Sequence, residues 1–130
     1  MAGITPQPGM IIRYSFAWET EEKDSENKTR PAMILVALAS GRVLVLPITH
    51  SEPRYGQDAL EIPDNLKQQL DLDEERSWIH FDSANIFTWM GYDVVPSAAY
   101  PMVPRWFYEQ VAKQYLEIAK AGRAAKIDRD

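Results

Sequence analysis

The stretch RPAMILVALASGRVLVLPITH, from Arg30 to His50, constrains the fold of this chain more than any other segment. Two apolar runs, PAMILVALA and RVLVLPIT, flank the pair Ser40-Gly41. Glycine supplies the backbone freedom that a tight turn needs. Apolar residues at consecutive positions are typical of strands buried on both faces. The sequence therefore predicts a buried antiparallel hairpin.

Polar residues stand at both ends of this hairpin. Arg30 opens the first strand, and Thr49 and His50 close the second. In an antiparallel hairpin the start of one strand faces the end of its partner, so we expect Arg30 beside Thr49. Pro47 has no backbone N–H, which predicts a bulge or an edge just before Thr49. The hairpin would then be a core scaffold that delivers polar groups to one rim.

Shorter segments on either side extend the β pattern. A loose lead-in is expected at residues 1–9, and the β-branched and aromatic run Met10–Trp18 predicts a first strand. Glu19–Thr29 has no apolar residue and is expected to be a solvated loop. Further short strands are expected at 58–63, 76–82 and 85–89, with a short helix or turn after an Asp64 N-cap.

A helix is expected near the end of the sequence. Phe107, Val111, Tyr115 and Ile118 recur with the period of a helix that buries one face. Pro104 suits its first turn, Gly122 is a natural stop, and residues 123–130 form a charged tail that we expect to fray. Several short strands and one C-terminal helix predict a mainly β domain over 1–130, built as a small antiparallel barrel.

Composition excludes several classes of site. The 130 residues include no cysteine, and neither histidine lies in a metal-binding motif, so we expect no metal and no cofactor. No signal peptide or membrane span is recognised, which favours a cytoplasmic protein. The net charge of -5 argues against general, charge-driven binding of nucleic acid. It leaves room for a small site with a few well-placed cations.

The order of the segments resembles the MazF/PemK family of type II toxin–antitoxin toxins. The matching segments, over roughly residues 8–120, are PGMIIRYSF, KTRPAMILVA, VLVLPITH, LEIPDNLKQQLDLDEERSWI, ANIFTW and the closing helix. The strongest part is the ordered set of Pro8-Gly9, Arg30-Pro31 and Pro47-Ile48-Thr49. The resemblance implies an SH3-like, plasmid-maintenance-toxin barrel with a C-terminal helix, usually a homodimer.

The resemblance also implies an activity. Family members are metal-independent endoribonucleases that cut single-stranded mRNA at short motifs, and an antitoxin protein silences them. The family's catalytic arginine corresponds to Arg30 in TRP, and its catalytic threonine or serine to Thr49 in PIT. The loop Glu19–Thr29 would lie over the RNA. In this chain the loop is acidic, which is unusual for an RNA channel.

Five other residues are candidates for this site. His50 has a free pKa near neutrality and could serve as an acid or a base. Lys28 could contact a phosphate, and Trp18, at the end of the first strand, could stack on a base. Arg13 alternates with Tyr14 on that strand, so one of the two faces outward. Asn85 lies on the late strand, which is near the groove in family dimers.

Plainer interpretations stay open for each candidate. His50 could be a loop residue, Arg30 could pair with the acidic loop, Thr49 could cap the next turn, and Lys28 could be solvated. Most tryptophans of a small barrel belong to its core. For the whole chain the alternatives are a non-catalytic barrel that binds protein, as gyrase-inhibiting toxins do, or a degenerate toxin kept as a regulator. Arg30 and Thr49 favour the nuclease, and the net charge favours the others.

Overall fold

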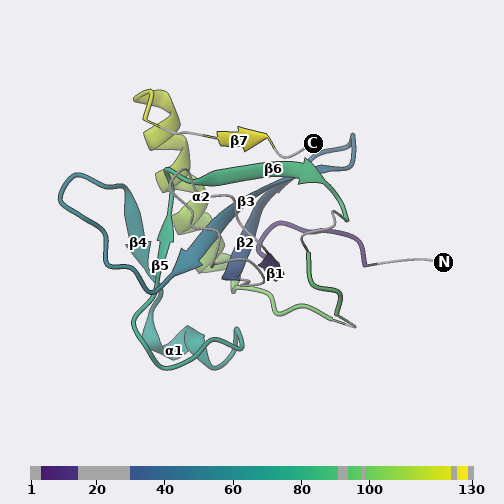
Figure 1. Ribbon diagram of the computed structural model, residues 1–130, viewed down its shortest axis with the longest axis horizontal. Helices are drawn as coiled ribbons and strands as arrows, with labels where there is room; N and C mark the ends of the chain where they lie inside the picture. Colours follow the sequence, from purple (N-terminus) through teal and green to yellow (C-terminus); the bar gives the residue numbers. More distant parts are fainter. Residues whose placement is uncertain (1–3, 15–29, 91–93, 98, 124–125, 129–130) are drawn as a thin grey trace, which may run out of the picture.

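The computed structural model describes residues 4–14, 30–90, 94–97, 99–123 and 126–128 (Figure 1). Six strands pair antiparallel: β1 (Ile11–Tyr14), β2 (Arg30–Ala37), β3 (Arg42–Thr49), β4 (Ala59–Glu61), β5 (Trp78–His80) and β6 (Ala84–Thr88). The helices are α1 (Asp64–Lys67) and α2 (Arg105–Lys120), and β7 (Lys126–Asp128) follows α2. The predicted fold class, mainly β with a C-terminal helix, is confirmed.

Strand β3 holds the sheet together. It pairs with β2 along one side, and on its other side with β6 over Arg42–Val45 and then with β5 over Ile48–Thr49. Pro47 lies in the gap between these two partners, where a residue without an N–H is tolerated. The strand pairings in the described ranges do not close into a ring, so the barrel stays a prediction.

Of the bulge or edge predicted at Pro47, the structure shows the edge, since the β6 and β5 pairings on one side of β3 leave Pro47 out. β3 continues through Pro47, which is paired with Ala32 of β2. The irregularity lies in β2, where the register shifts between Ile34 and Val36. The hairpin itself is as predicted, because the chain turns between Ala37 and Arg42 and Gly41 adopts a φ of 93°. A positive φ is readily available only to glycine.

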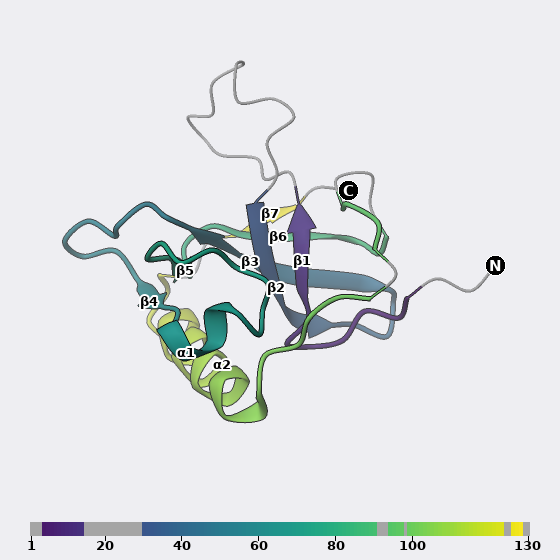
Figure 2. The same cartoon turned by 90° about the horizontal axis from the view of Figure 1, so that it is seen from below.

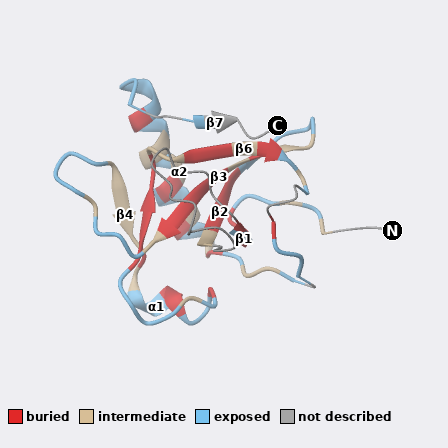
Figure 3. Cartoon of the chain, in the orientation of Figure 1, coloured by how far each residue is buried: buried red, intermediate tan, exposed pale blue. Residues whose placement is uncertain are grey.

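The sheet buries apolar residues on both faces, as the hairpin sequence predicts. Alternation along β1 and β2 sends Ile11 and Met33 to one core cluster, and Ile12 and Ile34 to another. The first cluster lies under α1 and α2, which Figure 2 shows on the same side of the sheet. Figure 3 shows the buried residues concentrated in the central strands.

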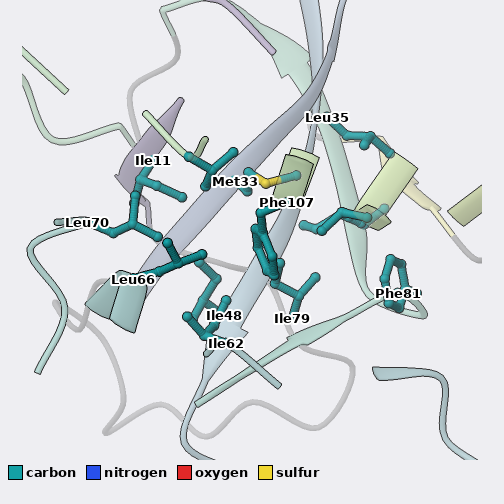
Figure 4. Packing of buried hydrophobic residues seen from close by; sticks show 14 of the residues in the cluster. Ile11, Met33, Leu35, Ile48, Ile62, Leu66, Leu70, Ile79, Phe81 and Phe107 are labelled. Atoms are coloured by element: carbon teal, nitrogen blue, oxygen red, sulfur yellow. The ribbon is translucent and has the colours of Figure 1, made fainter. Parts of the chain in front are cut away.

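Helix α2 buries the face that its sequence predicts. Phe107, Val111 and Ile118 are buried, and Tyr115 packs against the same cluster. Figure 4 shows Phe107 in the middle of this cluster, between Met33 of β2 and Ile79 of β5. After the C-cap Ala121, Gly122 has a φ of 77° and its N–H donates to the carbonyl of Ala119. The predicted helix and its stop are therefore confirmed.

The charged tail, which the sequence predicts to fray, forms a strand over part of its length. Lys126–Asp128 forms β7, which adds to β6 in parallel over Ala84–Ile86. Just before it, Arg123 makes two hydrogen bonds with the carboxylate of Asp58, at 3.0 and 3.1 Å. An open strand edge is a template for another strand, and the tail occupies that edge of β6. The prediction of a frayed tail is therefore wrong for these residues.

The start of the chain and of α1 also differ from the sequence-based expectation. Gly9 N–H donates to the carbonyl of Ile34, and the Trp89 indole N–H donates to the carbonyl of Ile4, so the described lead-in is tied to the sheet. Pro63 occupies the N-cap of α1, and Asp64 is the first helical residue instead. None of the helices in the described ranges has the length and apolarity to cross a membrane.

We predict that Phe107→Ala lowers the free energy of unfolding by about 3–5 kcal/mol, because it opens a cavity in the largest cluster. Leu116→Ala is the matched control, since Leu116 is on the same helix and its side chain is exposed. It should change stability by no more than about 0.5 kcal/mol. Urea denaturation of both variants measures the difference. Equal losses would contradict the assignment of the buried face.

Candidate functional site

A cavity of about 330 Å³ lies at the end of the sheet where β1 and β3 end and β2 and β5 begin. Ten residues line it: Arg13, Arg30, Pro31, Ile48, Thr49, His50, Ser51, Leu72, Asp73 and Ser77. In Figure 1 the arrowhead of β3 lies next to the start of β5, which marks this end of the sheet. Four of the candidates from the sequence, Arg13, Arg30, Thr49 and His50, meet here.

Strand register explains why these residues meet. Tyr14 of β1 is paired with Arg30 of β2, and Thr49 of β3 is paired with Trp78 of β5. The register of β2 and β3 ends with Ala32 paired with Pro47, and Arg30 and Thr49, two residues further along each strand, both line the cavity. The expectation that Arg30 and Thr49 lie together follows from this register. Neighbouring strands therefore bring their polar ends to one rim.

Thr49 has a local structural contact. Its Oγ1 accepts a hydrogen bond from the backbone N–H of Ser51 at 3.1 Å, so it caps the turn that follows β3. This is the plainer role considered for Thr49. A hydroxyl that accepts one hydrogen bond still has its own O–H to donate. Thr49 is half-buried and lines the cavity, so a ligand there could accept that hydrogen bond.

His50 bridges two parts of the chain through both ring nitrogens. Nδ1 lies 2.7 Å from the carbonyl oxygen of Arg76, and Nε2 lies 2.9 Å from Oδ2 of Asp73. Both partners are acceptors, so both contacts are satisfied only when both nitrogens carry a proton. The pKa of His50 is raised, chiefly by the hydrogen bond to Arg76; burial opposes the rise and Asp73 adds to it. The imidazolium form is thus favoured.

The segment Asp73–Ser77 forms the wall opposite the hairpin. Glu61 of β4 binds Arg76 through both carboxylate oxygens, each at 2.9 Å, and the Arg76 guanidinium lies over the Trp78 ring, 4.9 Å from its centroid. This contact lowers the pKa of Glu61, mainly because the carboxylate accepts hydrogen bonds from Arg76. His50, Asp73 and Arg76 therefore fasten this wall to the end of β3 and to β4.

A second cavity of about 230 Å³ adjoins the first. The two share Arg13, Pro31 and Leu72. Most residues in its lining are of apolar types, and the hydroxyl of Tyr100 in the lining is engaged, since it donates to the carbonyl of Val95 at 2.9 Å. A polar cavity next to an apolar one suits a ligand that has both characters.

Asn85, Lys28 and Trp18 are the sequence candidates that the described cavity lining does not include. Asn85 is fully buried on β6, its Nδ2 donates to the carbonyl of Ser83 at 3.1 Å, and it does not line this cavity. Lys28 and Trp18, and the acidic loop Glu19–Thr29, lie outside the described residues. Arg13 is exposed and Tyr14 is buried, which matches the alternation expected for their strand.

Six lining residues were not candidates in the sequence, and Asp73 and Ser77 are two of them. They lie in the polar stretch DLDEERS, which has no motif and precedes a short strand. The pairing of β3 with β5 and the contacts of His50 with Asp73 and Arg76 bring this stretch to the hairpin. Predicting how β3 pairs with β5 would have placed these two residues beside the hairpin.

His50, Asp73 and Glu75 could each offer one metal-ligand atom, and these atoms lie within 4.8 Å of one another. All three residues are exposed, and their polar groups already contact one another. His50 Nε2 is bound to Asp73 Oδ2, and the Glu75 N–H donates to Asp73 Oδ1 at 3.1 Å. A metal ion would have to displace the bond between His50 and Asp73.

No protein-family model matches this chain, and the comparison with curated proteins also gave no match. The function of the cavity is therefore inferred from its own residues and from the family resemblance.

We predict that His50 stabilises the protein in a pH-dependent way. Because its pKa is raised above 6.5 in the folded state, its stabilisation is fully present below that pH and is lost as the pH rises through the folded pKa. His50→Gln should therefore lose more stability at about pH 5 than at about pH 8. The difference should be about 0.2–1 kcal/mol, as for an exposed ion pair. Denaturation curves at both pH values measure it, and a larger loss at the higher pH would contradict this role.

Proposed function

We propose that this chain is a metal-independent endoribonuclease of the MazF/PemK type, the toxin of a type II toxin–antitoxin system. One observation supports the proposal more than any other. Arg13, Arg30 and Thr49 come from three neighbouring strands and line a single cavity at the end of the hairpin. Arg30 and Thr49 are the two residues on which the resemblance places the chemistry.

The chemistry uses the RNA's own nucleophile. The 2′-hydroxyl attacks the adjacent phosphorus and loses its proton, the bond from phosphorus to O5′ breaks, and the leaving O5′ takes up a proton. The products carry a 2′,3′-cyclic phosphate and a 5′-hydroxyl. Negative charge builds on the phosphoryl oxygens in the transition state, and a guanidinium can hydrogen-bond two such oxygens at once. In this proposal Arg30 stabilises that charge, and Thr49 donates to an oxygen and holds the phosphate in line.

His50 has a supporting role in this proposal. Both of its ring N–H groups donate to protein oxygens, so it would have to release Asp73 before its Nε2 proton could reach a leaving group. It therefore positions the wall that carries Asp73 and Ser77. The adjoining apolar cavity would receive a nucleotide next to the bound phosphate.

The acidic net charge of the whole sequence is compatible with an RNA site, because the charges closest to a bound phosphate are those of the cavity lining. Asp73 contacts His50, and the lining also holds the guanidinium groups of Arg13 and Arg30. The proposed partners are single-stranded RNA, a cognate antitoxin and a second copy of the chain, in the cytoplasm. The antitoxin would end in a segment that folds over the site on binding.

A non-catalytic barrel that binds protein is the second candidate. Two observations favour it: the net charge of -5, and the use of Thr49 Oγ1 as a turn cap. Both a degenerate toxin and a gyrase-inhibitor-like toxin belong to this class. The experiment below separates it from the nuclease.

We predict that the wild-type chain cleaves long single-stranded RNA in EDTA and leaves 2′,3′-cyclic phosphate ends. Arg30→Ala should lower the cleavage rate by about 100-fold or more, because it removes a preorganised charge from the transition state. Arg105→Ala is the matched control, since it also removes one guanidinium, at the exposed start of α2, where Arg105 pairs with Glu109. It should cleave as the wild type does.

Two results would contradict the proposal. Cleavage that Arg30→Ala leaves intact would place the activity elsewhere or in a contaminant. A folded wild-type chain that leaves several unrelated RNAs uncut would favour the non-catalytic protein.

A further inference from the structure

Ser77 is an anomaly in the wall of the cavity. Its side chain is 3% exposed, and its Oγ has no hydrogen-bond partner among the described residues. Its backbone is satisfied, because the Ser77 carbonyl accepts a hydrogen bond from the N–H of Ile62 at 2.9 Å. Ser77 directly precedes Trp78, the partner of Thr49, and it lines the cavity together with Thr49 and His50. The unsatisfied group is thus a hydroxyl at the end of the sheet.

A buried hydroxyl without a partner is unfavourable for folding. Such a group loses its hydrogen bonds to water and gains none from the protein, so native proteins hold few of them, and each needs an explanation. The neighbouring polar side chains are well satisfied: His50, Asp73 and Arg76 all make hydrogen bonds of 2.9 Å or shorter. The exception at Ser77 therefore suggests a partner that arrives with a ligand.

The surroundings of Ser77 indicate the chemistry of that partner. Ser77 lines the same cavity as the guanidinium groups of Arg13 and Arg30 and the hydroxyl of Thr49. All four groups can donate hydrogen bonds, and two of them carry a positive charge. Asp73 is the carboxylate in this lining, and its Oδ2 is held by His50. Several donors, two of them on cationic side chains, suit the oxygens of a phosphate group.

We infer that Ser77 is a ligand-binding residue whose Oγ donates a hydrogen bond to a phosphoryl oxygen in the cavity, from the side opposite Arg30 and Thr49. This inference rests on the proposed function and deepens it, since it adds the residue before β5 to a proposed site whose other donors come from β1 and the hairpin. With Ser77, donors on both walls hold the phosphate.

The test uses opposite effects on stability and on binding. Inorganic phosphate is titrated into the full-length chain and followed by two-dimensional NMR, for wild type, Ser77→Ala and Ser77→Cys. Removing an unsatisfied hydroxyl should leave the melting temperature unchanged or raise it. The same change should weaken phosphate binding roughly 10-fold, because the hydrogen bond to a charged group is lost. Cysteine keeps the size of serine and is a poor donor, so it should behave like alanine.

Ser83→Ala is the matched control. Ser83 is a half-buried serine outside the cavity lining, and its Oγ lies 3.5 Å from Oδ1 of Asp82. This variant should bind phosphate with wild-type affinity. The result that overturns the inference is a Ser77→Ala protein that binds phosphate as the wild type does. A lower melting temperature with unchanged affinity would also overturn it, because it would show a hydroxyl satisfied by a bound water only.

RNA cleavage by the same proteins separates this inference from the proposed function. Phosphate binding that depends on Ser77, in a wild-type chain that cuts no RNA, would support the inference and contradict the nuclease. RNA cleavage that Ser77→Ala leaves unchanged, with unchanged phosphate binding, would support the nuclease and overturn the inference. A wild-type chain that shows no phosphate binding would also overturn the inference.

Discussion

The change of partner along β3 is the constraint on which the fold and the cavity both depend. β3 pairs with β6 up to Val45 and with β5 from Ile48, and Pro47 occupies the gap because it has no N–H to leave unsatisfied. If β3 kept one partner, the start of β5 would not reach Thr49. The partner of β3 thus changes around Pro47, and the start of β5 lies beside a rim that β1, β2 and β3 already form.

The cavity shows how an acidic chain can present a cationic site. Long-range charge is screened in salt, whereas groups in contact with a ligand act over a few ångströms. The net charge of -5 describes the whole sequence, while the cavity is lined by Arg13, Arg30 and an Asp73 that His50 holds. Affinity for RNA would then come from a few placed groups, and general attraction along the backbone would contribute little.

Local patterns in the sequence were enough for the hairpin and for α2. Gly41 between two apolar runs, and the spacing of Phe107, Val111 and Ile118, depend only on near neighbours. Ser77, β7 and the burial of Asn85 depend on which distant strand lies alongside, and residue spacing carries no such information. Asn85 is the clearest example. A strand buried on both faces shows no alternation of apolar and polar residues, so its sequence does not reveal which side chains are exposed. The catalytic role proposed for Arg30 and Thr49 comes from the family resemblance alone.

The most direct test of the central claim, that single-stranded RNA binds at this end of the sheet, is photo-crosslinking. The full-length protein is irradiated with a random-sequence, 2′-O-methylated single-stranded RNA that contains a photoreactive uridine and cannot be cut. Mass spectrometry then identifies the crosslinked peptides. If single-stranded RNA binds at this end of the sheet, the crosslinks will fall on peptides that contain Arg13, Thr49 or Ser77. Crosslinks confined to α2, or none above the level of a duplex DNA control, would contradict it.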